Sequence, residues 1–221
     1  NSTASVKVEY NVNGIWQTKA PTYAGTYEVR VSVPGNSYFT AASTTKTYTI
    51  KPRGVEISGI TATKKVDDGT KTAELDSSTV VFARLIEGDA LTVSAEGTFA
   101  DSNAAKGKTV TITNLVLGGR SASNYVLTAD GQQAGTIADI NPKRITVTAD
   151  NLKKIVGGAD PVLTYTASGL VGEDTLSGIV VKRKAGEKVG TYAIKVSQKK
   201  GSNPNYRITF KNGIFTIQQA D

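Results

Sequence analysis

The side chains that could carry out acid/base chemistry in this chain are neighbouring carboxylates in two short polar segments. Glu87-Gly88-Asp89 and Glu173-Asp174 each place two acids close together. An acid/base mechanism needs two carboxylates held near each other in a cleft. The two segments, however, occupy the same place in two repeated stretches of sequence, and we do not expect a catalytic pair to recur in this way. We interpret both as turns in which aspartate side chains accept hydrogen bonds from backbone N–H groups.

Other catalytic and metal chemistry is restricted by composition. The 221 residues include no Cys, His or Met. Thiol catalysis and disulfides are therefore excluded, and the commonest general base and metal ligand is absent. Asp67-Asp68-Gly69 and Asp101-Ser102-Asn103 are candidates for calcium, but neither matches an EF-hand or a similar calcium loop. No phosphate-binding or dinucleotide motif is present. We predict a protein that is not an enzyme, with no metal site and no cofactor.

Carbohydrate is the ligand class for which the sequence offers candidate binding residues. Sugar sites commonly combine an exposed aromatic ring with polar neighbours. Trp16 is the single tryptophan, and Tyr23 lies close to it in sequence. Trp16 and Tyr23 are therefore the candidate sugar-stacking residues, with a cell-wall or host polysaccharide as the partner. The alternative is that Trp16 fills the small core of its own segment.

The net charge of +7 is unevenly distributed along the chain. Residues 143–221 carry thirteen basic and six acidic side chains, including the runs Lys182-Arg183-Lys184 and Lys199-Lys200, whereas residues 53–142 carry eight and eleven. A basic surface attracts many polyanions. The simplest interpretation is a solvated lysine-rich loop and a charged edge strand. We expect a monomer without a nucleic-acid partner.

No membrane or targeting segment is recognisable in the sequence. The apolar runs are all shorter than the roughly 18 residues that a membrane-spanning helix needs. No signal peptide or lipidation motif is present either. We therefore expect no membrane span in this part of the protein.

These candidate residues lie in a sequence that repeats itself three times. Ala24-Gly25-Thr26-Tyr27 is echoed by Val189-Gly190-Thr191-Tyr192, and a looser copy covers residues 106–112. Each copy is followed by an Asn and a Tyr, at Asn36-Ser37-Tyr38, Asn124-Tyr125 and Asn205-Tyr206. We expect these three tyrosines to pack, with their hydroxyls bonded to nearby backbone groups. A recurring unit indicates a tandem array of small modules rather than an enzyme built around one pocket.

The pattern within each unit is typical of β-strands. Apolar residues alternate with polar ones in residues 27–33 and 192–197, so each strand has one buried and one wet face. Asn13-Gly14 and Asn212-Gly213 lie between such runs and predict type I′ hairpins. Asp130-Gly131 predicts a looser hairpin at the matching place, so that the second and third units would each end in a hairpin.

Two prolines mark the boundaries between units. Pro52 and Pro142 each follow the short strand that we expect at the end of a unit, residues 48–50 and 136–140. Proline makes a short, stiff joint because it fixes φ and cannot donate a hydrogen bond to a strand ladder. We divide the chain into a first segment (1–52), a second segment (53–142) and a third segment (143–221). The first is a short β module, either compact or truncated. We predict an all-β fold of tandem small immunoglobulin-like β-sandwich modules in an extended rod, with β-grasp-like modules as the alternative.

The third segment resembles the MBG domain of large bacterial surface proteins. The resemblance is carried by residues 145–151, 158–165 and 169–176, and by Val189-Gly190-Thr191-Tyr192, Asn205-Tyr206 and Asn212-Gly213. The second segment is similar to the related YDG domain, through residues 68–73, 88–91 and 97–101, and through Gly107-Lys108 and Asn124-Tyr125. The aromatic residue that usually precedes Asp-Gly-Thr in that family is Asp67 here. The first segment looks like a shorter relative.

The resemblance implies an extracellular location at the bacterial cell surface. It also implies a role as a stalk or adhesion module. We therefore expect a non-catalytic repeat segment of a cell-surface or secreted protein, which spaces or presents a functional domain. The alternative is a carbohydrate-binding module centred on Trp16 and attached to a secreted glycoside hydrolase or adhesin.

Overall fold

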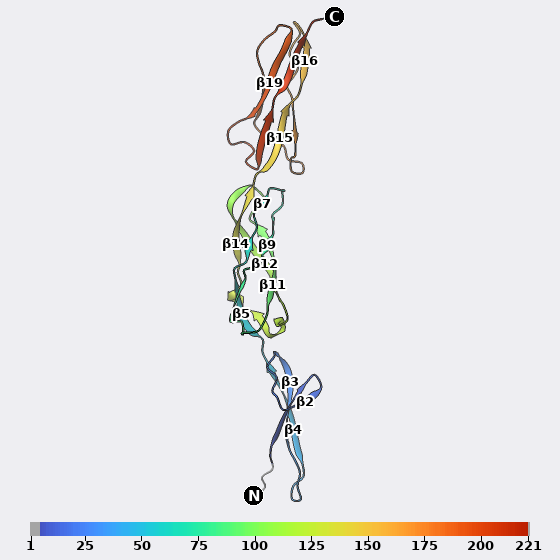
Figure 1. Ribbon diagram of the computed structural model, residues 1–221, viewed down its shortest axis with the longest axis vertical. Helices are drawn as coiled ribbons and strands as arrows, with labels where there is room; N and C mark the ends of the chain where they lie inside the picture. Colours follow the sequence, from blue (N-terminus) through green and yellow to red (C-terminus); the bar gives the residue numbers. More distant parts are fainter. Residues whose placement is uncertain (1–4, 221) are drawn as a thin grey trace. The chain divides into compact units, whose positions relative to one another are not determined.

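The computed structural model describes residues 5–220, and these are built from β-strands with short 3-10 turns (Figure 1). The all-β prediction is confirmed. The chain divides into two compact units. The first comprises the residues up to 60, 77–95 and 113–134, and the second comprises 61–76, 96–112 and the residues from 135 onward. No helix within residues 5–220 has the length and hydropathy of a membrane span.

The first unit begins with an antiparallel four-stranded sheet. Its order is β2 (Ile15–Gln17), β1 (Lys7–Val12), β3 (Gly25–Val33) and β4 (Ala42–Ile50). Val12 pairs with Ile15 across a two-residue loop, in which φ is 51° at Asn13 and 84° at Gly14. Positive φ at both positions is the geometry of a type I′ turn. The first predicted hairpin is therefore confirmed.

The two faces of this sheet differ in chemistry. One face carries valines and the rings of Tyr10, Tyr27 and Tyr48, whose centroids lie 6.1 Å and 5.8 Å apart in the two pairs that involve Tyr48. The opposite face carries Glu9, which is buried and forms salt bridges with Lys7 and Arg30. No hydrophobic side chain among residues 5–52 is fully buried. These residues therefore form a single sheet and not a sandwich, because all four strands belong to one layer.

The rest of the first unit contains a three-stranded sheet in the order β10 (Val81–Ala83), β5 (Arg53–Ser58) and β13 (Tyr125–Leu127). β5 and β13 are parallel, and β10 is antiparallel to β5. Two 3-10 turns flank β13, namely η1 (Ala122–Asn124) and η2 (Ala129–Gly131). The buried hydrophobic side chains here are Val55, Ile57, Ile60 and Tyr125.

The second unit holds most of a five-stranded sheet whose members β11 and β12 contain the points of division. The order is β7 (Lys65–Val66), β14 (Gly135–Asn141), β12 (Ala105–Gly118), β11 (Thr92–Phe99) and β8 (Thr72–Ala73). A short pair, β6 (Thr61–Ala62) and β9 (Leu75–Asp76), accompanies it. The core cluster comprises Ala73, Phe99, Val110, Ala138 and Ile140.

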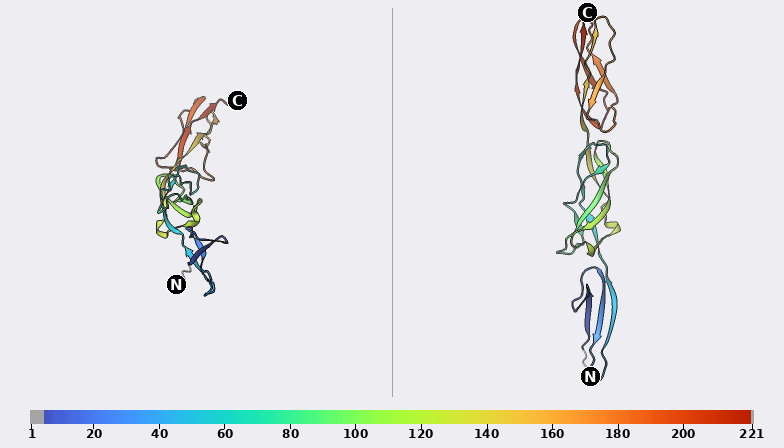
Figure 2. Two further views of the ribbon diagram at one scale, coloured as in Figure 1. Left: turned by 60° about the horizontal axis from the view of Figure 1, so that its bottom comes forward. Right: turned by 90° about the vertical axis from the view of Figure 1, so that its right-hand side faces the viewer.

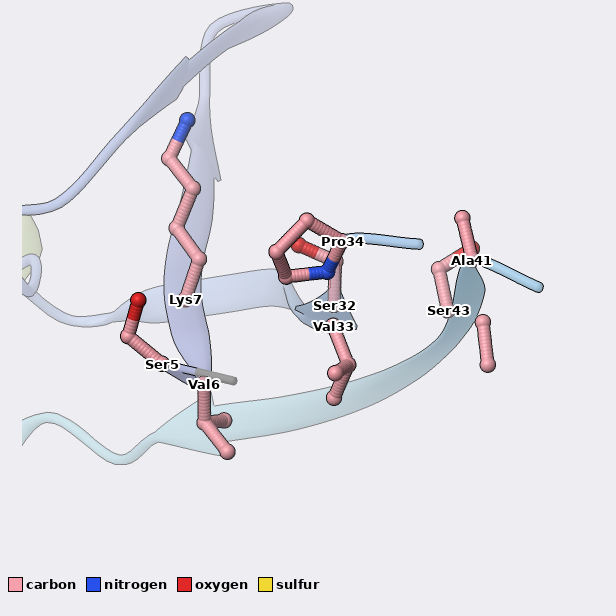
Figure 3. Close-up of a pocket in the computed structure, with 9 residues that line it drawn as sticks. Ser5, Val6, Lys7, Ser32, Val33, Pro34, Ala41 and Ser43 are labelled. Carbon is pink, nitrogen blue, oxygen red and sulfur yellow. The ribbon is translucent and has the colours of Figure 1, made fainter. Parts of the chain in front are cut away.

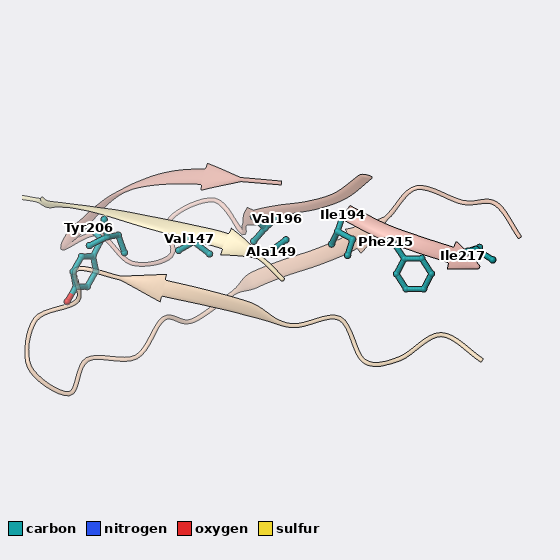
Figure 4. Packing of buried hydrophobic residues seen from close by; sticks show 8 residues of the cluster. Val147, Ala149, Ile194, Val196, Tyr206, Phe215 and Ile217 are labelled. Carbon is teal, nitrogen blue, oxygen red and sulfur yellow. The ribbon is translucent and has the colours of Figure 1, made fainter. Parts of the chain in front are cut away.

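The third segment, also in the second unit, is a sandwich of two sheets (Figure 2). One sheet has the order β17 (Tyr165–Ser168), β15 (Lys143–Ala149) and β20 (Tyr206–Lys211). The other has the order β16 (Leu152–Ile155), β21 (Gly213–Gln218), β19 (Gly190–Gln198) and β18 (Ile179–Arg183). Inward-facing residues of both sheets form one core, as Figure 4 shows for Val147, Ile194, Val196, Phe215 and Ile217.

The hairpin predicted at Asn212-Gly213 is wrong. β20 and β21 belong to different sheets, so the chain crosses from one sheet to the other at Asn212. β15 and β16 make the same crossing beside it, since β15 pairs parallel with β20 and β16 pairs parallel with β21. A Cβ on Gly213 would lie 2.4 Å from the carbonyl oxygen of Ala149. The glycine is needed for this close approach of two crossing backbones and not for a positive φ.

The looser hairpin predicted at Asp130-Gly131 is also wrong. These residues lie in η2, and the strands on either side, β13 and β14, belong to different sheets. At both places the strand before the turn and the strand after it each pair in parallel with a strand far away in sequence. The backbone hydrogen bonds of these pairings outweigh the local preference for a hairpin turn.

Candidate functional site

Trp16 lies on β2, on the charged face of the first sheet. The ring is partly buried, and the guanidinium carbon of Arg30 stands 4.2 Å from its centroid. Arg30 also donates to the carboxylate of Glu9 at 2.8 Å. A cation stacked on the indole at this distance is attracted by the ring's negative face. Trp16 therefore does not fill the valine and tyrosine face of its segment, and one side of its ring is covered by Arg30.

Tyr23 lies in the loop before β3 and is 65% exposed. Its carbonyl oxygen accepts a 3.0 Å hydrogen bond from the Tyr27 hydroxyl. Tyr23 borders a cavity of about 570 Å³ whose other lining residues are mostly polar: Gly88, Asp89, Arg120, Ser121, Ser123 and Asn124. Trp16 does not line this cavity, so the two predicted stacking residues do not share it. The sequence could not identify the polar neighbours, because they lie 65 to 101 residues further along the chain.

A second hollow of about 530 Å³ lies at one end of the first sheet, lined by residues 5–7, 32–34 and 41–43. Figure 3 shows the side chains of Val6 and Val33 pointing to the same side, with Lys7 extending away from them. Val6 is 61% exposed. The lining supplies aliphatic groups, serine hydroxyls and Lys7, but no carboxylate and no aromatic ring. It lacks the converging polar groups of a typical ligand pocket.

The first candidate carboxylate pair is divided between solvent and a hydrogen-bonded turn. Glu87 is exposed, whereas Asp89 accepts from the Tyr125 hydroxyl at 2.5 Å and from Ser121 Oγ at 3.1 Å. The Tyr125 oxygen accepts from the Ile86 N–H at 3.1 Å, and the Asp89 N–H donates to the Ile86 carbonyl. Burial, together with the neighbouring Asp89 carboxylate, raises the pKa of Tyr125. We call this closed ring of bonds a Tyr–Asp bracket.

The third segment contains the same bracket. The Tyr206 hydroxyl donates to Asp174 and accepts from the Val171 N–H at 3.0 Å, while the Asp174 N–H donates to the Val171 carbonyl. The interpretation of both acidic segments as turns is confirmed, but the acids accept from tyrosine hydroxyls and not chiefly from backbone N–H groups. Tyr125 and Tyr206 are buried and bonded to the backbone as expected.

The first repeat departs from this pattern. Tyr38 is 86% exposed, so the prediction that it packs is wrong. The side-chain oxygen of Asn36 accepts from the backbone N–H groups of Tyr38 and Phe39 and closes a local turn. A single sheet offers no second layer against which Tyr38 could pack, whereas the tyrosines of the other two segments are buried.

Each of the two candidate calcium loops is a turn with one acid paired to a lysine. Asp68 accepts from Lys65 at 2.8 Å and from the Thr70 N–H, and Asp101 accepts from Lys108 at 2.6 Å. The Lys65 ammonium, with the Thr70 donors, lowers the pKa of Asp68 to about 2. Within the described part of the chain, no three acids are grouped as metal ligands. Asp68 and Asp101 therefore already have a cation as partner, and the buried Asp67 accepts from the Gly69 N–H at 2.9 Å.

The basic run of the third segment divides between surface and interior. β18 is an edge strand, and Lys182 on it is exposed. Lys184, the first residue after β18, is exposed as well. Exposed lysines are expected at an edge strand, where they hinder pairing with another chain. The prediction that Arg183 is solvated is wrong, because its side chain is only 10% exposed. It pairs with Asp160 and Glu187, and its guanidinium carbon lies 4.8 Å from the centroid of the Phe215 ring.

Lys154 completes this group of charges. Its side chain is 6% exposed, and its ammonium contacts Asp160 at 2.8 Å and Glu187 at 2.5 Å. Hydrogen bonds from Arg183 and Lys154 lower the pKa of Asp160 to about 2. The four groups close one end of the core with paired charges. This is a structural role, because each acid is shared by two cations.

Comparison with known families accounts for most of the chain. Residues 49–134 match the family model of the YDG domain, and residues 145–216 match that of the MBG domain (YGX type). The two matches occur in tandem, and they confirm the resemblance on which the sequence-based expectation rested. A search of curated proteins finds no match.

Proposed function

We propose that this chain, which carries a YDG domain followed by an MBG domain, is a non-catalytic repeat segment of a bacterial cell-surface or secreted protein. In this proposal the segment spaces or presents another domain of the same protein outside the cell. The tandem arrangement of the two family matches supports a repeat role. The cell-surface location follows from the kind of protein in which such domains occur.

The observation that carries the proposal is the recurrence of the Tyr–Asp bracket. In each acidic pair the aspartate, Asp89 or Asp174, accepts a hydrogen bond from a tyrosine hydroxyl and so stabilises its own turn. Their neighbours Glu87 and Glu173 are exposed. Because the two acids are bonded in the same way to a tyrosine hydroxyl in successive domains, we assign them a role in the fold of each domain.

The spacer role can be tested by display on a bacterial surface. A reporter domain is attached after residue 221 and the chain is anchored at its N-terminal end, and binding of bead-coupled ligand to the reporter is measured. We expect the chain to give more binding than a Gly/Ser linker of equal residue number, because such a linker behaves as a flexible coil. Equal binding would contradict the spacer role. Turnover of wall polysaccharide by the chain, abolished in Asp89→Asn, would contradict its non-catalytic nature.

A second candidate function is carbohydrate binding at Tyr23. The exposed ring beside a polar cavity of about 570 Å³ provides an aromatic surface and hydrogen-bonding neighbours, including Asp89 and Arg120. These are the two elements that a sugar site combines. Trp16 is a separate candidate, since its ring does not line this cavity and is partly covered by Arg30.

A panel of glycans and whole wall material tests this candidate. Saturable binding that is lost in Tyr23→Ala but kept in Trp16→Ala would support the cavity beside Tyr23. The opposite pattern, with a change in Trp16 emission, would move the site to β2. Tyr38→Ala is a matched control, because that ring is also exposed but lies in another loop. Absence of saturable binding to every glycan would contradict the candidate.

A further inference from the structure

In the second and third segments, the asparagine before the bracket tyrosine contacts the segment that precedes its own. Asn124 Oδ1 accepts a 3.0 Å hydrogen bond from the N–H of Ala24. Asn205 Oδ1 accepts a 2.9 Å hydrogen bond from the N–H of Ala104. Each contact joins residues about a hundred positions apart. One dipeptide therefore holds its own turn through the tyrosine and the preceding segment through the asparagine.

The two donors occupy equivalent positions. Ala24 directly precedes Gly25, which pairs with the closing residue Ile50. Ala104 directly precedes Ala105, which pairs with Ile140. In both segments, the bound N–H belongs to the residue just before the strand that pairs with the last strand of the segment. The equivalence was hidden in the sequence because Ala105 stands where the other copies have glycine.

The amide of Asn205 is fixed in orientation by its surroundings. Its Nδ2 donates to Asn103 Oδ1 at 3.1 Å, so that the oxygen is left to accept from Ala104. Its backbone carbonyl accepts from the Lys143 N–H at 2.9 Å, directly after the joint at Pro142. The side chain that reaches the preceding segment is therefore anchored on its own segment beside the linker.

The third segment presents the same donor position at its far end. Gly190 pairs with Ile217, so Val189 is the equivalent of Ala24. The Tyr192 hydroxyl donates to the Lys188 carbonyl at 2.8 Å, just as the Tyr27 hydroxyl donates to the Tyr23 carbonyl at 3.0 Å. The φ values of Gly190 and Gly25 are 149° and 158°. Val189 is 53% exposed.

We propose that this strand start is a docking site for another module of the same kind. In the third segment, the N–H of Val189 would be bound by the side-chain oxygen of an asparagine that precedes a bracket tyrosine in a following YDG-type or MBG-type module. The proposal rests on the proposed function as a repeat segment. The contact joins a neutral amide to a backbone N–H, so salt screens it much less than it screens a pair of surface charges.

Amide hydrogen exchange of the full chain, followed by NMR, tests the asparagine contacts. We expect the N–H groups of Ala24 and Ala104 to exchange slowly and that of Val189 to exchange fast. Asn205→Ala should speed exchange at Ala104 by roughly tenfold, the equivalent of one lost hydrogen bond. The Val171 N–H, held by Tyr206, should stay protected and so report that the third segment is folded.

Asn151→Ala is the matched control. Asn151 Oδ1 accepts from the Ile214 N–H within the third segment, so this change should release Ile214 and leave Ala104 protected. If Ala104 exchanges equally fast in the wild type and in Asn205→Ala, the proposed contact is overturned. Loss of protection throughout the third segment in Asn205→Ala would also overturn a role confined to the joint.

The docking site itself is tested in an extended chain, residues 1–217 followed by a second copy of 141–221. This sequence repeats the joint Ile140-Asn141-Pro142 after Ile217. We expect exchange at Val189 to slow by roughly tenfold, and to return to its fast rate when the appended copy carries Asn205→Ala. Unchanged exchange at Val189 would overturn docking. That failure is distinct from failure of the spacer role, which is judged by access to the reporter.

Discussion

The hydroxyl of Tyr206 donates a hydrogen bond to the carboxylate of Asp174, 32 residues earlier in the chain. The same oxygen accepts from the Val171 N–H, so that a single phenol closes the turn that contains both residues. Tyr125 and Asp89 repeat this arrangement. The same side-chain chemistry therefore holds the turn in both segments.

Tyr206→Phe should destabilise the third segment by about 1–3 kcal/mol, because it removes the partner of Asp174 and of the Val171 N–H together. Urea denaturation measures the loss. Tyr165→Phe is the control, since that ring is 36% exposed and its change should cost less than about 0.5 kcal/mol. Equal losses in the two variants would contradict a role of the bracket in stability.

Acid should weaken the third segment through Asp160. Its pKa in the folded chain is about 2, below its ordinary value of 3.8. A lowered pKa stabilises the fold at a pH above the ordinary value, and this contribution is lost as the pH falls from about 4 towards 2. Asp160→Asn should be less stable than the wild type at pH 6, and its stability should depend less on pH in this window.

Urea midpoints measured between pH 6 and pH 2.5 check this dependence. Glu173→Gln serves as the control, because Glu173 is exposed. Its profile should follow that of the wild type. Parallel profiles for Asp160→Asn and the wild type would show that the salt bridges to Arg183 and Lys154 do not contribute to acid sensitivity.

Gly213→Ala should cost about 1–3 kcal/mol, because the new methyl group would meet the carbonyl oxygens of Ala149 and Asp150 at 2.4 Å and 2.8 Å. Gly158→Ala is a suitable control in the same segment, since its nearest contact would be the Ile155 carbonyl oxygen at 3.2 Å. Chemical denaturation of the two variants compares them. An unchanged Gly213→Ala protein would mean that the crossing strands separate at little cost.

Arg30→Ala should expose the Trp16 ring. The guanidinium that lies 4.2 Å from the ring centroid would be removed, and we expect a red-shifted emission and stronger quenching by acrylamide. Lys46→Ala is the control, because Lys46 pairs with Val29 on the opposite face of the same sheet. Identical spectra for the wild type and Arg30→Ala would show that solvent already reaches both sides of the ring.

Much of the local structure could be predicted from the sequence. The alternation in residues 27–33 gives β3 its two faces, and Asn13-Gly14 forms the expected turn because both residues tolerate positive φ. The same reasoning failed at Asn212-Gly213. A turn preference is local, whereas the competing parallel pairing of β20 with β15 joins segments about sixty residues apart and has no local signature.

The candidate site shows the same limit. The sequence identified Trp16, Tyr23 and the acidic segments by residue type, but not their partners. Arg30 covers Trp16 because β1 brings β2 and β3 into one sheet. Asn124 and Asp89 lie beside Tyr23 because loops far apart in sequence meet. Arg183 was assigned to a solvated run, yet its position on β18 directs it towards Phe215 and its neighbours outward.

The sequence by itself therefore determined the all-β class, the repeated units and the absence of thiol and imidazole chemistry, because periodicity and composition are properties of the chain alone. Tertiary structure decided which strands cross between sheets, which acids hold a tyrosine and which asparagines reach the preceding segment. These depend on pairings between distant residues, where backbone ladders and the burial of polar groups select one arrangement from many that the local sequence allows.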